Sequence, residues 1–427
     1  MNDNEIIQRK TKILATLGPS SKTIKKIIEL TKAGANAFRL NCSHLEEKDL
    51  EEYIEKIRKA EKIINKPIGI LIDLQGPKIR IGEVSKNDNI LESGNSFFID
   101  NSKEIGNSKR VYLSNKKVFK SVKKGHLILI DDGNIHLRVT SVKNNIIRTK
   151  ILQGGTIKSN KGLNLPDSDL KTSALSSLDK KYVKIAINFD VNWIALSFVQ
   201  KPSDIKELKK FCDNKISIMA KIEKPSALKY INEICEIADG IMIARGDLGV
   251  ELPIETVPGW QKEIIRTSRA KGKPVVVSTQ MLESMTSFLT PTRAEVSDVA
   301  NAVFEGADTI MLSAESASGN YPVEAVKMMH KIAFSTENEK NYNNIIANQI
   351  EQTPNTTPDA IATAAKTLAD ELSSPIIVCY TESGSTGIKV SRVRPSQTIL
   401  TITPVIHTAR KLSLVWGVLC LLQKDEE

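Results

Sequence analysis

Eight short apolar runs, most of them separated by amphipathic helical stretches, constrain the fold of this 427-residue chain more than any other feature. The runs cover residues 10–18, 36–41, 68–74, 193–198, 217–223, 240–247, 274–279 and 309–315. Helical stretches lie between them, for example at residues 21–32, 47–64, 203–211, 226–238 and 258–270. Strand–helix alternation repeated eight times predicts a closed (β/α)8 barrel of parallel strands. An open doubly wound sheet is the alternative, but no Gly-x-Gly-x-x-Gly turn follows the first run.

The alternation breaks once, between the third and fourth runs. Short β patterns replace the helical period there, at residues 96–99, 110–113, 126–130, 135–142 and 146–152. Turn sequences at residues 131–133 and 154–155 separate some of them. We therefore expect a β lid domain at residues 75–167, inserted into a barrel formed by residues 1–74 and 168–340. After Tyr342 a polar linker leads to a C-terminal α/β domain at residues 355–427, with a helix at 359–372 and a strand at 375–380.

Composition limits the classes of protein that need consideration. The chain is 41% hydrophobic and 26% charged, has no apolar stretch near 18 residues, and begins with a polar segment. These features predict neither a membrane span nor a signal peptide. The five cysteines are scattered without metal-ligand spacing, which favours a reduced, cytoplasmic protein.

The net charge of +10 raises the possibility of a nucleic-acid partner. Most of the excess lies in residues 74–168, which contain 17 Lys and Arg against 8 Asp and Glu. Few aromatic residues and no nucleic-acid motif accompany these lysines, so we expect no nucleic-acid partner. Two interpretations of the basic segment stay open: an attractive lid over a polyphosphate substrate, or a compositional bias without function.

Charged side chains end two neighbouring runs. Lys221 and Glu223 end the fifth run, and Asp247 ends the sixth. Because strand side chains alternate between faces, Lys221 and Glu223 point the same way, and Asp247 joins them if the two strands are parallel and adjacent. Two carboxylates beside an ammonium suit a hard divalent cation next to an anionic oxygen. Surface charges that merely cap buried strands are the alternative for either run alone.

Nearly every other run also ends in polar side chains. In a barrel of this type, the carboxyl ends of the strands form the active site. The remaining candidates at these ends are Arg39, Asn41, Cys42, Ser43, His44, Asp73, Lys78, Arg80, Gly246, Thr279 and Ser313. A barrel without a functional site would not place so many charges, amides and hydroxyls at one rim.

At these strand ends the sequence closely resembles the pyruvate kinase family, over nearly the whole chain. The resemblance rests on Arg39-Leu-Asn-Cys-Ser-His44, Asp73-Leu-Gln-Gly-Pro-Lys-Ile-Arg80, Ser159-Asn-Lys-Gly-Leu-Asn-Leu-Pro166, Ala220-Lys-Ile-Glu223, Met242-Ile-Ala-Arg-Gly-Asp-Leu-Gly249, Ser278-Thr-Gln-Met-Leu-Glu-Ser-Met285, Pro291-Thr-Arg-Ala-Glu-Val-Ser-Asp298 and Met311-Leu-Ser-Ala-Glu-Ser316. The family architecture that this resemblance implies is a barrel with an inserted β lid and a C-terminal α/β domain.

The resemblance implies transfer of the phosphoryl group of phosphoenolpyruvate to ADP, which yields ATP and, after protonation of the enolate, pyruvate. Glu223 and Asp247 would bind Mg²⁺ or Mn²⁺ as a Lewis acid and template. Lys221 would neutralise charge on the transferred phosphoryl group, which Arg39 would also contact.

The same resemblance assigns the substrate and nucleotide contacts. Backbone N–H groups at Gly246 and Asp247 would hold the substrate carboxylate. Thr279 would contact the substrate and help deliver the enolate proton, and Ser313 is either a relay partner or a polar barrel residue. The implied nucleotide contacts are Asn41, Cys42, Ser43, His44, Arg80 and Lys161.

One departure from the family pattern concerns a monovalent cation. Many members bind K⁺ near the positions of Asn41, Ser43 and Asp73, and carry Thr, Lys and Glu where this chain has Leu74, Gln75 and Lys78. A potassium ligand is therefore lost and a built-in ammonium gained, as in the potassium-independent branch. We predict that Lys78 substitutes for K⁺.

A second departure concerns the C-terminal domain. Family members continue past Trp416-Gly-Val418, so we expect an incomplete third domain in a chain that ends at Glu427, although the family typically forms a homotetramer. Three readings follow: an active pyruvate kinase, a non-catalytic remnant of the family, and a metal-dependent aldolase or lyase barrel acting on a pyruvate enolate. The third would not explain residues 39–44, Lys161 or the lid.

Overall fold

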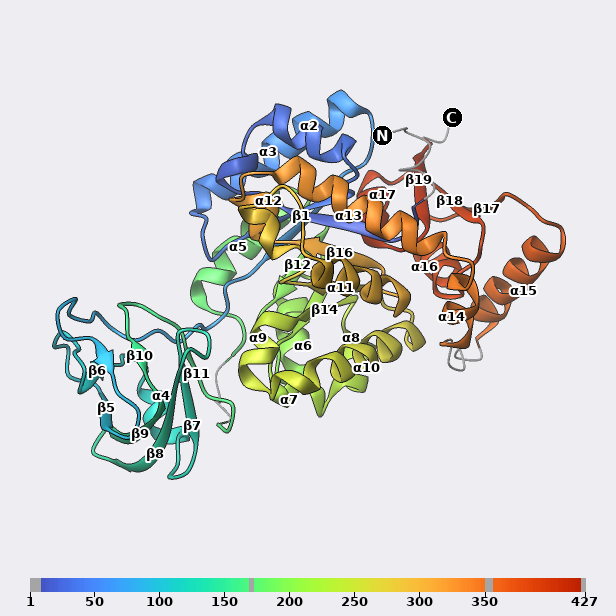
Figure 1. Ribbon diagram of the computed structural model, residues 1–427. Coiled ribbons are helices and arrows are strands. Elements are labelled where there is room, and N and C mark those ends of the chain that lie inside the picture. The colour runs from blue at the N-terminus through green and yellow to red at the C-terminus, as the bar shows by residue number, and fades with distance from the viewer. Residues whose placement is uncertain (1–8, 169–172, 350–355, 424–427) are drawn as a thin grey trace.

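The computed structural model describes residues 9–168, 173–349 and 356–423, and its centre is a closed barrel of eight parallel strands (Figure 1). The strands, in their order around the barrel, are β1 (Lys12–Thr16), β16 (Thr309–Leu312), β15 (Val275–Ser278), β14 (Gly240–Ala244), β13 (Ser217–Ile222), β12 (Trp193–Leu196), β3 (Gly69–Asp73) and β2 (Ala37–Asn41). Each predicted run contains one of these strands. The barrel prediction is confirmed, and the open doubly wound alternative is wrong.

The strands are buried on both faces, which explains why their sequences are nearly continuous apolar runs. Side chains that point inward form a separate core, made of Leu14, Ala37, Leu71, Trp193, Ala195, Met219, Met242, Val276, Met311 and Leu414. Leu414 comes from the C-terminal region, so the barrel interior is closed at one end by residues outside the eight strands. The interior is therefore a packed core and not a channel.

Helices cover the outside of the barrel. They are α2 (Ile24–Lys32), α3 (Glu47–Ile64), α5 (Ser177–Asn188), α6 (Pro202–Phe211), α7 (Pro225–Leu228), α8 (Ile231–Ile237), α9 (Arg245–Glu251), α10 (Val257–Ala270), α11 (Arg293–Phe304), α12 (Ala314–Ala317), α13 (Pro322–Glu337) and α14 (Tyr342–Asn348). The single helix predicted at 226–238 is wrong: it is two helices, because the backbone of Tyr230 (φ −118°, ψ 21°) leaves the helical region. The predicted polar linker after Tyr342 begins instead with α14.

The segment between β3 and α5 forms a separate β structure with its own hydrophobic core. Its main sheet has the order β11 (Leu163–Asn164), β7 (Leu127–Ile130), β8 (Ile135–Lys143), β9 (Ile146–Gln153), β5 (Ser96–Asp100) and β6 (Arg110–Tyr112), beside a small sheet of β10 (Gly155–Thr156) and β4 (Ile90–Leu91). Asp131, Asp132 and Gly133 have positive φ and form the turn between β7 and β8. The sequence analysis did not predict one helix in this segment, α4 (Lys116–Ser121), whose N-terminus is capped by Asn115.

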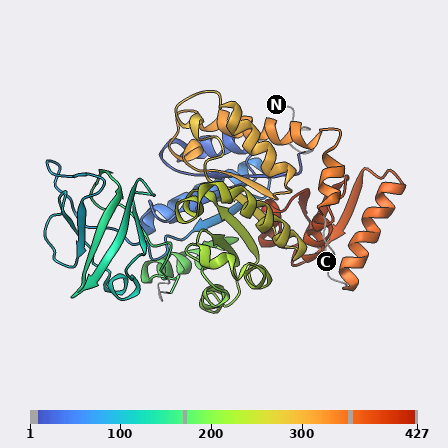
Figure 2. The same ribbon diagram turned by 60° about the horizontal axis from the view of Figure 1, so that its bottom comes forward.

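The C-terminal domain lies on the opposite side of the barrel from the inserted β structure (Figures 1 and 2). It contains α15 (Thr357–Glu371), α16 (Ser385–Arg392), α17 (Ile406–Lys411) and a parallel sheet in the order β17 (Ile376–Tyr380), β18 (Thr398–Thr403), β19 (Val418–Leu422). Ion pairs join it to the barrel: Arg410 Nη2 lies 2.6 Å from Glu61 Oε2, and Arg394 Nη1 lies 3.0 Å from Asp308 Oδ1. The domain start expected at residue 355 lies outside the described residues, and the three domain boundaries stay predictions.

Within the described residues, no helix combines the length and the apolarity that crossing a membrane requires.

A buried histidine on α13 gives the stability of the fold a pH dependence. His330 is 1% exposed and its Nδ1 lies 3.1 Å from Arg9 Nη1; burial, with the nearby Arg9 charge, lowers the pKa of His330 to about 4. The unfolded chain therefore binds a proton below pH 6.5 that the folded chain excludes. We expect the free energy of unfolding to fall between pH 6.5 and pH 4, by at most about 1.4 kcal/mol per pH unit from this group.

Urea unfolding of the wild type and of His330→Gln at several pH values between 7 and 4 measures this contribution. The variant lacks the titrating group, so its free energy of unfolding should fall less steeply with pH. Equal slopes for the two proteins would contradict the prediction.

Candidate active site

Lys221 lies at the centre of a buried charge cluster at the carboxyl end of β13. Its Nζ lies 2.7 Å from Ser197 Oγ, 3.2 Å from Asp73 Oδ1 and 3.3 Å from Glu223 Oε2. The predicted orientation of Lys221 and Glu223 toward the same side is thus confirmed. A second contact fixes Glu223, because its Oε1 accepts a hydrogen bond from the backbone N–H of Phe198 at 2.6 Å. These contacts fix both side chains at one point of the barrel rim.

Arg39 reaches the same cluster from β2 through Asp73. Its Nε and Nη2 lie 2.8 and 2.6 Å from Asp73 Oδ2, and its Nη1 donates to Thr16 Oγ1 at 3.1 Å. Asp73 therefore accepts from Arg39 with one oxygen and faces Lys221 with the other, at only 1% exposure. The sequence analysis associated Asp73 with a monovalent cation. It did not predict that Asp73 would contact both Arg39 and Lys221.

Burial and charge set the protonation states of the cluster. Burial alone would lower the pKa of Lys221, but the carboxylates around it, led by Asp73 and Glu223, raise that pKa above its ordinary value. Burial would raise the pKa of Asp73, yet Lys221 and Arg39 keep it below its usual range. Burial raises the pKa of Glu223, against the opposing effect of Lys221, and Asp247 adds to the rise. Lys221 is therefore a firmly held ammonium at neutral pH.

Asp247 approaches the cluster from the segment that follows the neighbouring strand β14. The strands β13 and β14 pair in parallel, with Lys221 opposite Met242, as the prediction required. The predicted strand was too long, because β14 ends at Ala244 and the chain turns into α9 at Arg245. Asp247 therefore lies in the first helical turn and is exposed, whereas Glu223 is 3% exposed. Asp247 is close enough to influence the pKa of both Lys221 and Glu223.

Thr279 joins the end of β15 to the start of α9. Its hydroxyl accepts the backbone N–H of Gly246 at 2.8 Å and donates to the carbonyl of Ser278 at 2.6 Å. Ser313 lies one strand further on, at the end of β16, where its backbone N–H donates to Glu315 Oε2 at 2.7 Å. Glu315 is buried and its other oxygen accepts from Leu282 N, so it ties the ends of β15 and β16 together.

The expected nucleotide residues form two groups. Asn41 is the last residue of β2, and Cys42, Ser43 and His44 follow it. Asn41 Oδ1 accepts from Ser43 N at 3.1 Å, and Cys42 is buried. Arg80 and Lys161 belong to the base of the β insertion, where the backbones of Ile81 and Lys161 are hydrogen bonded. Lys161 Nζ pairs with Asp131 Oδ1 at 2.7 Å. Residues 80 and 161 are thus brought together.

Lys78 is exposed at the base of the inserted domain. A side chain at Gly162 would meet the Lys78 Cε at 3.2 Å, which places the lysine against the returning strand of that domain. It shares a pocket with Asp132 and Asp247. Lys78 thus lies at the interface between the insertion and the barrel.

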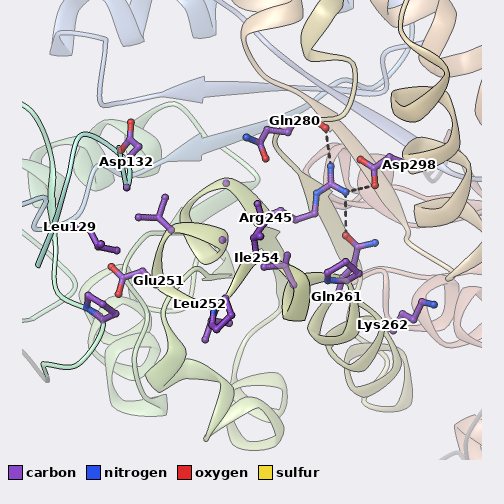
Figure 3. Close-up of a pocket in the computed structure, with 18 of the residues that line it drawn as sticks. Leu129, Asp132, Arg245, Glu251, Leu252, Ile254, Gln261, Lys262, Gln280 and Asp298 are labelled. Carbon is purple, nitrogen blue, oxygen red and sulfur yellow. Dashed lines mark hydrogen bonds and ion pairs between the residues drawn. The ribbon is translucent and has the colours of Figure 1, made fainter. Parts of the chain in front are cut away.

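A cleft of about 1150 Å³ separates the inserted domain from α9, α10 and α11. Figure 3 shows Leu129 and Asp132 of the insertion on one side, and Arg245 and Gln261 on the other. Gly246 lies on the cleft wall, and Asp247 lines the adjoining pocket of about 210 Å³. The cleft therefore opens beside the charge cluster and is large enough for a nucleotide-sized ligand.

Sequence reasoning missed two further residues that support the site. Ser197 donates to Leu74 O at 2.7 Å and accepts from Lys221, and its position at the end of the fourth predicted run could have indicated it. Asp179 accepts from Gln75 N and Gly76 N at 3.0 and 3.3 Å, and so fixes the exit of the chain into the insertion. Nothing in the local sequence of α5 signals that contact.

Within the described residues there is no group of three or more His, Cys, Asp or Glu side chains that could hold a metal ion. The donor set at Glu223 and Asp247 is smaller, but it consists of two carboxylates, the hard ligands that Mg²⁺ and Mn²⁺ prefer. Mg²⁺ is commonly bound through one or two carboxylates plus substrate oxygens. The residues present thus fit a divalent cation that a substrate completes.

Comparisons with known proteins agree with this fold. The family model "Pyruvate kinase, barrel domain" matches residues 8–326, and "Pyruvate kinase, alpha/beta domain" matches residues 359–427. The chain is 47% identical to a pyruvate kinase of Methylorubrum extorquens over 417 residues, covering 98% of this chain and 87% of that protein. It is 40% identical to one of Thermotoga maritima over 418 residues, covering 97% and 89%.

A crystal structure of a pyruvate kinase from Cryptosporidium parvum superposes with a TM-score of 0.94 at 34% identity, covering 99% of this chain and 89% of that one. The fold, the charged site and these matches define a phosphotransferase enzyme. The chain belongs to the pyruvate kinase family. The aldolase reading is thereby set aside.

Proposed function

We propose that this chain transfers the phosphoryl group of phosphoenolpyruvate to ADP, with a divalent cation, and protonates the resulting enolate to pyruvate. The observation that carries the proposal is the Lys221 ammonium, held at 3.2 Å from Asp73, 3.3 Å from Glu223 and 2.7 Å from Ser197 at the barrel rim. A cation in a water-poor site stabilises a phosphoryl group in flight, and such transfer depends mainly on positioning and electrostatics.

Each proposed role belongs to a named group. Lys221 and Arg39 neutralise charge on the transferred phosphoryl group, and Glu223 with Asp247 holds Mg²⁺ or Mn²⁺. The cation, when bound, supplies Lewis-acid stabilisation of the enolate and phosphoryl oxygens. The N–H groups of Gly246 and Asp247, at the start of α9, orient the substrate carboxylate.

Further groups complete the proposal. Thr279 contacts the substrate and delivers the enolate proton, directly or through water, with Ser313 as the candidate relay. The proposed nucleotide contacts are Asn41, Cys42, Ser43, His44, Arg80 and Lys161. By family relation we also propose a homotetramer, which sedimentation equilibrium of the purified chain would check.

A coupled assay of the purified chain with phosphoenolpyruvate, ADP and Mg²⁺ tests the function. Pyruvate formation that stops on chelation of the cation and returns on its addition is the expected result. A folded chain that binds ADP but forms no pyruvate would support the alternative of a non-catalytic family member and contradict the proposal.

We further propose that Lys78 replaces a monovalent cation, so that activity does not require K⁺. The side chain of Leu74, which is 1% exposed, has no oxygen to bind K⁺, and Lys78 places an ammonium on the pocket that Asp247 lines. The expected result is full activity with tetramethylammonium as the only monovalent cation. Stimulation of the wild type by KCl of about tenfold or more, roughly 1.4 kcal/mol in barrier, would contradict this.

The matched variant for this assay is Leu74→Thr combined with Lys78→Glu. It restores a hydroxyl and a carboxylate and removes the ammonium, so its activity should become dependent on KCl while the wild type stays independent of it. If the variant were equally indifferent to KCl, Lys78 would not be the substitute.

A further inference from the structure

The turn that carries Thr279 has an unfavourable backbone conformation. Thr279 and Gln280, directly after β15, have φ values of 68° and 54°. A left-handed conformation is uncommon for any residue other than glycine, and is least favourable for a β-branched one such as threonine. Such a conformation persists only where surrounding groups hold it. Something must therefore hold this turn against its local preference.

Arg245 supplies contacts of that kind. Its Nη2 donates to the carbonyl oxygens of Thr279 and Gln280, at 2.7 and 3.2 Å. Because a guanidinium is a rigid planar fork, a second anchor fixes its orientation. That anchor is Asp298 on α11, whose Oδ1 lies 2.6 Å from Nη1 (Figure 3). The Arg245 side chain is only 10% exposed, so the fork is also confined by packing.

The hydroxyl of Thr279 depends on this turn. Its Oγ1 lies 2.8 Å from Gly246 N and 2.6 Å from Ser278 O, so the two ends of β14 and β15 meet at this atom. A Cβ at Gly246 would lie 3.3 Å from the same oxygen, which shows how closely the α9 backbone approaches it. A rotation of the Thr279 backbone would move the hydroxyl and free the Gly246 N–H.

We propose that Arg245, anchored by Asp298, is a positioning residue that holds the Thr279 hydroxyl and the Gly246 N–H at the positions that the reaction requires. This inference rests on the proposed function, because it assigns Arg245 to the proton-delivery side of that chemistry. Arg245 acts on the reaction through Thr279 and takes no part in bond making. The competing explanation is that Arg245 only stabilises the packing of α9 against α11.

A double-mutant cycle separates the two explanations. Arg245→Lys keeps the charge but loses the fork, and Thr279→Val removes the hydroxyl while keeping the shape. Each single variant should lower kcat, by up to about 100-fold for a displacement near 1 Å. The double variant should be no slower than the slower single variant, because the hydroxyl that Arg245 positions is already absent. If the kcat of the double variant were reduced by the product of the two single reductions, the proposal would be overturned.

A second readout reports the proton-delivery step alone. Exchange of the methyl hydrogens of pyruvate with D₂O, followed by NMR in the presence of ATP and Mg²⁺, should slow in Arg245→Lys by the same factor as in Thr279→Val. A purely structural role would lower the melting temperature and leave this exchange rate per folded molecule unchanged. That result would overturn the proposal.

Two further variants serve as internal checks. Asp298→Asn keeps a hydrogen-bonding side chain and tests the anchor if Arg245→Lys fails to fold; it should reproduce the slower exchange in a milder form. Arg266→Lys, on the exposed face of α10, is the matched control and should behave as the wild type. If the wild type forms no pyruvate, the proposed function and this inference are both wrong. If the wild type is active and the exchange rates of Arg245→Lys and Asp298→Asn equal that of the wild type, only the inference is wrong.

Discussion

Replacement of Lys221 by Met is expected to lower kcat by about 10²–10³-fold, the range measured when one preorganised charge-stabilising donor is removed from an active site. The reason is that the ammonium is fixed by three oxygens and faces the site where phosphoryl charge develops. The KM for ADP should change little, because the proposed nucleotide contacts lie on other elements. Steady-state kinetics with both substrates varied gives the two constants.

The matched control is Lys206→Met, which makes the same chemical change on the exposed face of α6. Circular dichroism and thermal melting of both variants establish that the fold is retained. If Lys221→Met kept near-wild-type kcat, the assignment of the phosphoryl-stabilising group would be wrong.

Asp73→Asn is expected to destabilise the protein by about 3–5 kcal/mol, as for other buried ion pairs from which one partner is removed. Asp73 is the carboxylate between Arg39 and Lys221, so its loss leaves two cations close together in a buried site. Activity should fall as well, because both proposed phosphoryl-binding side chains lose the group that orients them. Urea unfolding and kinetics on the same preparation measure the two effects.

The difference in unfolding free energy between the wild type and Asp73→Asn should depend on pH with a definite sign. Lys221 and Arg39 hold the pKa of Asp73 below its ordinary value of 3.8 against the effect of burial, so its ionisation stabilises the fold above that pH. The stability difference between wild type and Asp73→Asn should be constant from pH 7 to about pH 4 and shrink below it. Asp88→Asn, an exposed change on the inserted domain, is the control. A difference that grew on acidification would contradict the assignment of Asp73 as the charged partner.

The barrel could be predicted because its strands are signalled locally. Buried parallel strands are nearly continuous apolar runs, and their polar ends mark the rim at which the site forms. Lys221 and Glu223 could be placed side by side from the two-residue period of a strand, and Asp247 from the parallel pairing of β13 with β14. These inferences need only the alternation of side chains along one strand and the identity of the strand that pairs with it.

The remaining features depend on contacts between distant segments. Asp73 was predicted to lie near the site, but its simultaneous contacts to Arg39 and Lys221 require the packed barrel. The strand β18 was missed for a different reason: its buried side chains include Thr401 and Thr403, each 0% exposed, while Leu400 lies on its less buried face. An alternation of apolar and polar residues predicts the opposite orientation. Thr401 faces α16 of the same domain, where a Cβ at Gly387 would lie 2.8 Å from its Oγ1.

Leu414 in the barrel interior has a consequence for biosynthesis. This side chain packs with Leu14 of the first strand, about 400 residues earlier, and its carbonyl accepts from Thr309 Oγ1 at 2.9 Å. The first and last barrel strands are themselves partners in the sheet. As a ribosome makes a chain from its N-terminus, the apolar interior of this barrel remains open at one end until residue 414 has left the exit tunnel. The nascent barrel therefore exposes an aggregation-prone surface for most of its translation, and its closing step is a contact of high sequence separation, which is intrinsically slow.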